Sequence, residues 1–214
     1  MCDMIYSDPP DCLNMSIGEA VFSQRAIRRF DHEKCISHEH IEVILNAAAK
    51  APNGGNAQPC RFLVVRDRTL IKAFGRLYYT AWWAKRRDDF GWKGPGDMPK
   101  DSFYQWPALL AEEMCKVPLV ILAFAPRDLP AASSVFPGVQ NLMLAARALG
   151  IGSVLTTLHV DVMEEVYALF KVPLDMRFYC SIPLGYPRGK FGPTKRYPIS
   201  MTTFWDQWDI KLPC

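Results

Sequence analysis

An unbroken apolar run, VPLVILAFAP at residues 117–126, constrains the fold of this chain most strongly. It is about half as long as the roughly 20 residues that a membrane-spanning helix needs. We therefore interpret residues 118–125 as a buried strand. Helical patterns flank it in the sequence, so the chain is predicted to form layers of helices and sheet, in the α/β or α+β class.

Helical and strand patterns alternate along the whole chain, and Ser16 with Glu19 and Asp161 with Glu164 have the spacing of helix-capping boxes. Residues 91–106 are expected to be irregular. No repeat or linker interrupts the pattern, which predicts one domain over 16–208 after a tail at 1–15. The predicted helices are 16–23, 37–51, 67–90, 107–115, 135–149 and 161–170, and the predicted strands are 61–65, 118–125, 152–157 and 177–187.

Charge and cysteine usage exclude several classes of function. The net charge is +3, from 25 basic and 22 acidic residues, which is too small to indicate nucleic acid or a membrane surface. The seven cysteines include no CxxC pair, so we expect reduced thiols in a cytoplasm and neither a disulfide framework nor a zinc site. The four histidines lack ligand spacing, and His159 is expected on a loop surface.

The loop APNGGNAQPC, residues 51–60, contains far more turn residues than an ordinary connection needs. Asn53, Gly54 and Gly55 allow positive φ angles. Asn56 and Gln58 can each donate and accept hydrogen bonds, which suits a flat heterocycle with carbonyl and ring-nitrogen edges. The loop has no acid, base or nucleophile. It is either a binding loop for such a ring or an elaborate turn from helix to strand.

Two basic stretches could hold an anion. RAIRRF contains Arg25, Arg28 and Arg29, and PTKRYP contains Lys195 and Arg196. Arginine binds phosphate oxygens through paired, charge-assisted hydrogen bonds. Read one at a time, each stretch is more typical of solvated surface charge.

The order of these motifs is that of a known family. RAIRRF, APNGGNAQPCRFLVV, GVQNLMLAARALGIGSVLTTL, PLGYP and PTKR together resemble the nitroreductase family of FMN-dependent oxidoreductases, over about residues 16–208. The resemblance implies an α+β fold: a three-layer α/β/α sandwich with a mainly antiparallel central sheet. It also implies a homodimer with FMN at the interface, in which the apolar C-terminal segment around Trp205 and Trp208 wraps the other subunit.

The resemblance further implies roles for individual residues. Arg25 and Arg28 would hold the FMN phosphate, the 51–60 loop would lie beside the isoalloxazine, and the backbone amides of residues 156–158 would approach flavin N5 and O4. The family often has Ser at position 26 and Trp at position 60, where this chain has Ala and Cys. The implied cofactor-binding residues are Arg25, Ala26, Arg28, Pro52, Asn53, Gly54, Asn56, Gln58, Thr156, Thr157, Leu158, Lys195 and Arg196.

Residues 77–106 are rich in aromatic side chains and match the family least. They are predicted to form a variable lid over the flavin, with rings that stack on nicotinamide and a small aromatic substrate. The alternative is core or dimer packing. Lys85, Arg86 and Arg87 are expected on a solvated helix face. The candidate substrate-pocket residues are Tyr79, Trp83, Trp92 and Tyr104.

The activity implied by the resemblance needs no catalytic side chain, because flavin N5 carries the chemistry. NADH or NADPH would pass hydride to FMN and leave, and a nitroaromatic or quinone would then be reduced in a ping-pong cycle. Two alternatives stay open: a flavin-binding or storage protein without turnover, and a specialised relative that fragments flavin or removes halogen reductively.

Overall fold

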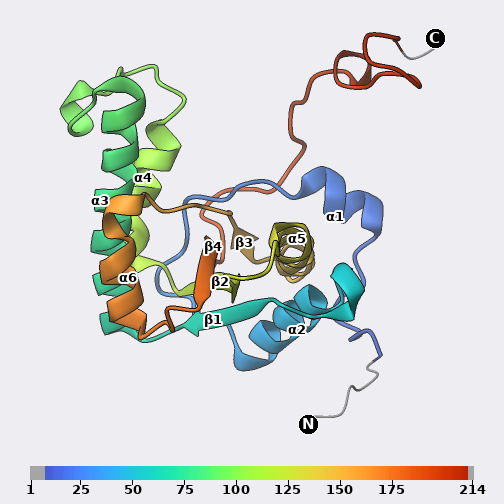
Figure 1. Cartoon of the computed structure of the whole chain (residues 1–214), viewed down its shortest axis with the longest axis horizontal. Helices are drawn as coiled ribbons and strands as arrows, with labels where there is room; N and C mark the ends of the chain where they lie inside the picture. Colours follow the sequence, from blue (N-terminus) through green and yellow to red (C-terminus); the bar gives the residue numbers. More distant parts are fainter. Residues whose placement is uncertain (1–7, 212–214) are drawn as a thin grey trace.

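The apolar run forms strand β2 (Leu119–Pro126) inside a four-stranded antiparallel sheet with the order β1-β2-β4-β3 (Figure 1). The computed structural model describes residues 8–211. β1 is Arg61–Val65, β3 is Gly152–Ser153 and β4 is Met176–Gly185. Every position of β2 except the last is buried, which confirms the predicted buried strand.

Helices cover both faces of the sheet. α2 (His38–Ala49) and α5 (Ala132–Ala148) lie on one face, and α3 (Arg68–Phe90), α4 (Gln105–Glu113) and α6 (Met163–Phe170) lie on the other (Figure 1). Alternate residues of β2 enter the two cores: Ile121 packs with Ile44 and Leu142, whereas Leu122 packs with Phe74 and Val166. The predicted three-layer α+β sandwich is therefore confirmed.

Most helices begin and end where their capping residues predict. The side chain of Ser16 accepts a hydrogen bond at 3.1 Å from the amide of Glu19 and starts α1 (Ile17–Ser23). Ser37 caps α2 in the same way, and Asp67 accepts from two amides at the start of α3. Gly91, with φ of 74°, ends α3 in the left-handed conformation that glycine adopts without strain.

The strand predicted over 152–157 is wrong in its middle. Ser181 exchanges both backbone hydrogen bonds with Thr156, at 2.9 Å each. The next equivalent pair would join Val154 to Pro183 of β4. Proline has no N–H to donate, so this pair cannot form the same two hydrogen bonds. Pairing is therefore limited to Gly152–Ser153 and to an isolated bridge at Thr156.

Two other boundaries also differ from the prediction. The helix predicted from residue 161 begins as a 3-10 turn, Val160–Val162, and α6 follows from Met163. Its cap is the ring of His159, which accepts from the amide of Asp161 at 3.3 Å, so Asp161 is not the capping side chain. The helix predicted over 107–115 ends at Glu113 and continues as a 3-10 turn, Met114–Lys116.

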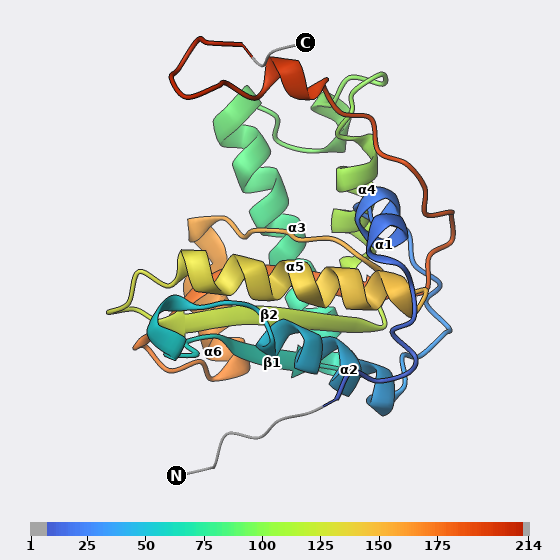
Figure 2. The same ribbon diagram turned by 90° about the vertical axis from the view of Figure 1, so that its right-hand side faces the viewer.

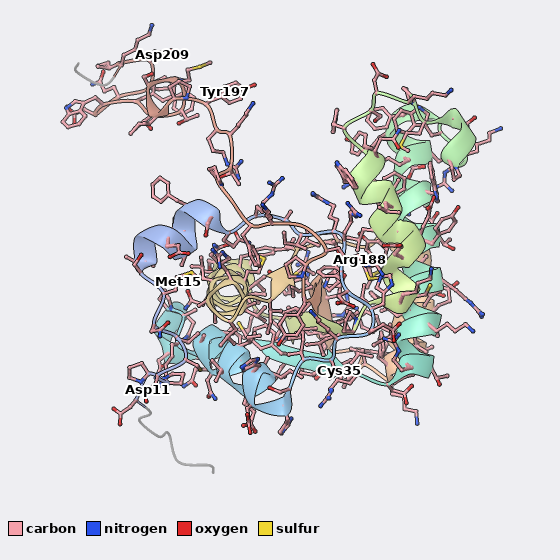
Figure 3. The ribbon with its side chains drawn as sticks, turned by 180° about the vertical axis from the view of Figure 1, so that it is seen from behind. Asp11, Met15, Cys35, Arg188, Tyr197 and Asp209 are labelled. Carbon is pink, nitrogen blue, oxygen red and sulfur yellow. The ribbon has the colours of Figure 1, made fainter. Side chains whose placement is uncertain are left out.

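The C-terminal segment first runs along the body and then leaves it. The amide of Arg188 donates to the carbonyl of Arg29 at 3.0 Å, and the amide of Gly192 donates to that of Ser23 at 3.3 Å. Beyond this point the chain extends away from the sandwich, and Figure 3 shows Tyr197 and Asp209 on this extension. Trp208 is 79 % exposed. An apolar segment this exposed needs a surface to cover it.

No helix within residues 8–211 is long and apolar enough to cross a lipid bilayer.

Candidate functional site

The basic segment 25–30 is fixed to the edge of the sheet by its backbone. Ala26 forms a parallel bridge with Ser153, and the amide of Ile27 donates to the carbonyl of Ser153 at 3.0 Å. Ile27 is buried against Gly152, where a Cβ would come within 2.7 Å of the isoleucine side chain. With Ile27 turned inward, Arg25 and Arg29 stay exposed and Arg28 is half-buried.

These arginines surround a pocket of about 240 Å³. Among residues 8–211, Arg25, Arg28 and Lys190 have no side-chain hydrogen bond or ion pair, and the guanidinium of Arg29 lies 5.3 Å from the centre of the Trp106 ring. Burial lowers the pKa of Arg28, yet an arginine keeps its charge at neutral pH. The uncompensated positive charge makes this pocket suitable for a phosphate. Its lining residues are Arg25, Ala26, Ile27, Arg28, Arg29, Trp106, Gly189 and Lys190.

The second predicted basic pair does not line this pocket. Lys195 and Arg196 are exposed on the segment that leaves the body, and Arg196 donates to the carbonyl of Lys195 at 2.8 Å. Lys190 lies in the pocket instead, and the prediction from sequence missed it. Its positive charge three residues after the PLGYP motif is the signal in the sequence, and in the fold this stretch pairs with the basic segment through Arg188 and Arg29.

The 51–60 loop forms a 3-10 turn, Gly54–Asn56, held by side chains. The carboxamide oxygen of Asn53 accepts from the amide of Gln58 at 2.8 Å, and the amide of Gly54 donates to the Ser134 hydroxyl at 3.2 Å. Positive φ occurs at Gly55 (57°), Asn56 (54°) and Gln58 (48°). Asn53 is extended and Gly54 is not in the left-handed region, so the backbone turns two residues later than expected.

The loop and the basic pocket lie at opposite ends of α5 (Figure 2). Gly54 contacts Ser134 in the first turn of this helix, whereas Arg147 in its last turn donates to the Ser23 hydroxyl at 2.9 Å, just before the basic segment. At about 1.5 Å per residue, Ser134 and Arg147 are about 20 Å apart. A single chain therefore does not bring the two halves of the expected site into one pocket.

The segment 156–158 does lie near the basic pocket. Burial raises the pKa of Tyr78 of α3 to about 12, and the nearby Thr156 hydroxyl and Arg28 charge oppose this shift. The amide of Thr156 donates to Ser181 and is not available to a ligand. Within residues 8–211 the amides of Thr157 and Leu158 have no hydrogen-bond acceptor, so they are the free donors of this segment.

Residues 21–186 match the model of the nitroreductase family. This chain belongs to that family.

Named relatives agree with this assignment. A protein of Archaeoglobus fulgidus, provisionally named NADH dehydrogenase/NAD(P)H nitroreductase, is 31% identical over 83% of this chain and 86% of its own length. The iodotyrosine deiodinase of Thermotoga neapolitana is 29% identical over 82% of this chain and 89% of its own length. A crystal structure of oxidized iodotyrosine deiodinase bound to FMN and 3-iodo-L-tyrosine is 25% identical, with a TM-score of 0.68, and the match covers 86% of this chain and 94% of that one.

Part of the aromatic region forms a cage around a buried arginine. The Arg86 guanidinium lies 4.5 Å from the ring centre of Tyr104 and 5.2 Å from that of Trp82, and it pairs with Asp89 at 2.6 Å. Arg86 is buried, so its placement on a solvated helix face was wrong. The Trp92 ring centre is 6.0 Å from that of Tyr104 beside the cage, and contact of these two rings with a substrate stays a prediction.

The other two candidate pocket residues, Tyr79 and Trp83, lie on α3 before Arg86. Tyr79 is partly exposed and its ring centre is 6.3 Å from that of Trp83, which is buried. The Trp83 ring centre is 4.6 Å from that of Trp82 in the cage, and contact of Tyr79 and Trp83 with a substrate stays a prediction. His159 is not on an open loop surface: its ring pairs with Asp88 at 2.9 Å and with Asp161 at 3.1 Å, and so joins the 156–158 segment to α3.

We expect Arg86→Ala to lower the free energy of unfolding by about 2–3 kcal/mol, because it removes a buried cation from its aromatic cage and leaves Asp89 without its partner. Urea unfolding followed by tryptophan fluorescence measures this change. The neighbouring Lys85 is exposed, so Lys85→Ala is the control and should change stability by less than about 0.5 kcal/mol. Equal effects of the two variants would contradict a structural role for the cage.

Cys60 behaves as a packing residue. Its thiol donates to the Ser134 carbonyl at 3.3 Å, and burial raises its pKa. Burial also raises the pKa of Cys180 to about 12. Because only the thiolate is nucleophilic, iodoacetamide at pH 8 should modify the exposed Cys12 and Cys35 first and Cys60 and Cys180 slowest. Peptide mass spectrometry would show this order, and labelling of Cys60 as fast as Cys35 would contradict it. Cys2 and Cys214 lie outside the described residues.

Proposed function

We propose that this chain is an FMN-dependent oxidoreductase that uses NADH or NADPH to reduce a flat acceptor such as a nitroaromatic or a quinone. Membership of the nitroreductase family and the FMN-bound relative support flavin-dependent oxidoreduction. The observation that carries the proposal is the pocket of uncompensated cations, Arg25, Arg28 and Lys190. When bound, FMN supplies the hydride-accepting and hydride-donating centre.

In this proposal the residues of the chain bind FMN and orient its ring. The cations of the pocket hold the phosphate and favour negative charge nearby. The free amides of Thr157 and Leu158 donate hydrogen bonds toward the ring edge. A cytoplasmic location belongs to the same proposal, supported by the five free cysteines among residues 8–211.

Initial rates test the catalytic part of the proposal. We expect NAD(P)H oxidation to depend on an added quinone or nitroaromatic, with parallel double-reciprocal lines when donor and acceptor are varied, because the two substrates use one face in turn. Rates that stay near zero with the acceptor present, while bound FMN remains oxidised, would instead favour the storage alternative. Intersecting lines would contradict the ping-pong order.

We also propose that a homodimer completes the site, because the amide loop lies about 20 Å along α5 from the cationic pocket. A two-fold axis that brings the α5 helices of two copies together in opposite directions would place the loop of each beside the pocket of the other. Exposed apolar residues on α1, such as Phe22 at 77 %, and the exposed C-terminal segment provide surface for this contact.

Mixed dimers test whether the site is shared. Arg28→Ala removes a cation from the pocket, and Gly54→Phe adds a ring to the loop at a glycine whose Cβ would have no neighbour within 4 Å in the isolated chain. Each variant alone should bind little FMN. If the site is shared, a mixed dimer has one intact site and binds one FMN. If each chain forms its own site, the mixed dimer binds none. Measured mass shows whether Gly54→Phe still dimerises.

Reductive dehalogenation of a halogenated aromatic is the second candidate. Two findings favour it: the 29% identity to iodotyrosine deiodinase over most of both chains, and the similarity to the structure that holds FMN and 3-iodo-L-tyrosine. Halide release from 3-iodotyrosine by the reduced protein would support it. Turnover of quinones without any halide release would favour the first candidate.

A further inference from the structure

Four side chains form a closed ring of contacts directly after the segment that carries the free amides. Arg87 and Asp88 come from α3, His159 caps the 3-10 turn Val160–Val162, and Asp161 lies in that turn. His159 Nε2 lies 2.9 Å from Asp88, and the Arg87 guanidinium donates to Asp88 at 2.8 Å and to Asp161 at 3.1 Å. An isolated surface ion pair contributes little, but a network restricts each of its members. The ring of contacts therefore ties this turn to α3.

The contact of His159 with α3 holds in both protonation states of its imidazole. The hydrogen bond from Arg87 holds the pKa of Asp88 below its ordinary value, so this carboxylate is ionised at neutral pH and only accepts. Nε2 therefore carries a proton and donates to it. On the other side, Nδ1 lies 3.3 Å from the amide nitrogen of Asp161 and 3.1 Å from its carboxylate. A neutral ring accepts from the amide and a protonated ring donates to the carboxylate, so Nε2 stays on Asp88 in either state.

The free amides lie between this contact and a second anchor. Thr156 exchanges both backbone hydrogen bonds with Ser181 at 2.9 Å each, and the two hydroxyls are 2.8 Å apart. His159 follows three residues later, with only 16 % of its side chain exposed. Between the two anchors are Thr157 and Leu158, whose amides have no acceptor in the described part of the chain. A span of two residues held at both ends has few conformations, so the directions of its donors are set in advance.

We propose that His159 is a positioning residue of the flavin site: by tying its end of the segment to α3, it holds the amides of Thr157 and Leu158 where they donate to the flavin ring. The proposal rests on the proposed function, because it assigns the flavin to these amides. The segment starts at the edge of the cationic pocket, where Ser153 bridges Ala26 of the pocket lining. Donors that are already oriented stabilise negative charge on the reduced ring without reorganisation.

His159→Leu removes both contacts of the imidazole, and Tyr167→Phe is its matched control. The Tyr167 hydroxyl also makes two hydrogen bonds: it donates to the Met176 carbonyl at 2.8 Å and accepts from the Phe178 amide at 3.0 Å. These bonds lie at the start of β4, at the far end from its pairing with β3. Both variants should lose similar stability. Only His159→Leu should weaken FMN binding, by about threefold to tenfold in a fluorescence titration.

The midpoint potential of bound FMN separates positioning from stability. It should fall in His159→Leu, because misplaced donors stabilise the anionic reduced form less. A preference for reduced flavin that is lower by about threefold to tenfold corresponds to a fall of about 15–30 mV. Tyr167→Phe should keep the wild-type potential. His159→Gln retains an N–H donor at about the reach of Nε2, and should recover most of the affinity and the potential.

Two variants of Asp88 separate positioning from charge and keep the test decisive if His159→Leu does not fold. Asp88 is exposed on α3, so both variants should fold. Loss of a negative charge near the flavin would by itself raise the potential, because an anion disfavours the anionic reduced form. Loss of positioning lowers it. We expect Asp88→Leu to lower the potential as His159→Leu does. Asp88→Asn keeps an oxygen that accepts from His159, and should leave the potential unchanged or slightly raised.

The outcomes distinguish failure of this proposal from failure of the proposed function. A wild-type protein that binds no FMN would overturn the proposed function. A wild-type protein that binds FMN, with His159→Leu and Asp88→Leu at the wild-type affinity and potential, would overturn the positioning role alone. A potential that rises in Asp88→Leu would also overturn it, because charge and not position would then be the effect of this network.

Discussion

Arg28→Ala is expected to weaken FMN binding by about 30-fold to several hundredfold, or about 2–4 kcal/mol. The residue is half-buried in a pocket where it has no partner within the described chain. A phosphate or anionic ring edge would therefore receive its full set of charge-assisted hydrogen bonds. Arg25→Ala should have a comparable effect, because Arg25 lines the same pocket and is also unpaired.

Fluorescence titration of the apoprotein with FMN measures these affinities. Arg76 is an exposed arginine of α3 outside the pocket, so Arg76→Ala controls for the loss of one positive charge. Arg29→Ala should weaken binding less than Arg28→Ala, because the Arg29 guanidinium already lies on the Trp106 ring. Equal, small effects at all three pocket arginines would mean that the phosphate binds elsewhere.

Gly75→Ala is expected to destabilise the fold by about 3 kcal/mol or more. Gly75 lies in α3 where the helix packs on the 3-10 turn Met114–Lys116, and an added Cβ would be 2.4 Å from the backbone nitrogen and Cα of Cys115. Backbone atoms cannot rotate aside as a side chain can, so the helix itself would have to move.

Thermal or urea unfolding of the apoprotein measures this effect without the cofactor. Gly18 of α1 is the matched control: its added Cβ would have no neighbour within 4 Å. Gly18→Ala should leave stability unchanged or raise it by about 0.5 kcal/mol, as alanine favours helix over glycine. Similar unfolding midpoints for the two alanine variants would contradict the close packing of α3 on this turn.

The layers of the fold were predictable because they follow from local patterns. The run 117–126 could only be a buried strand, and Ser16, Ser37 and Gly91 mark helix ends by their own chemistry. The interruption after β3 was not predicted, because it is caused by Pro183 on another strand. The residues 152–157 themselves do not show that the partner strand lacks a hydrogen-bond donor.

In the candidate site, too, local patterns were predictable and features that depend on tertiary packing were not. The cations of RAIRRF and the amides of the 51–60 loop were recognisable as binding groups, but their separation along α5 depends on tertiary packing. Lys190 lies in the pocket because residues 188–190 pair with the basic segment 25–30 through Arg188 and Arg29.

The visible spectrum of the purified protein, recorded without oxygen before and after addition of NADPH and then NADH, tests the central claim most directly. The account predicts flavin absorption bands that bleach with at least one of the two nucleotides. It also predicts that the Arg28→Ala protein is nearly colourless when prepared in the same way. A wild-type protein that is colourless and cannot be reconstituted with FMN would contradict the account.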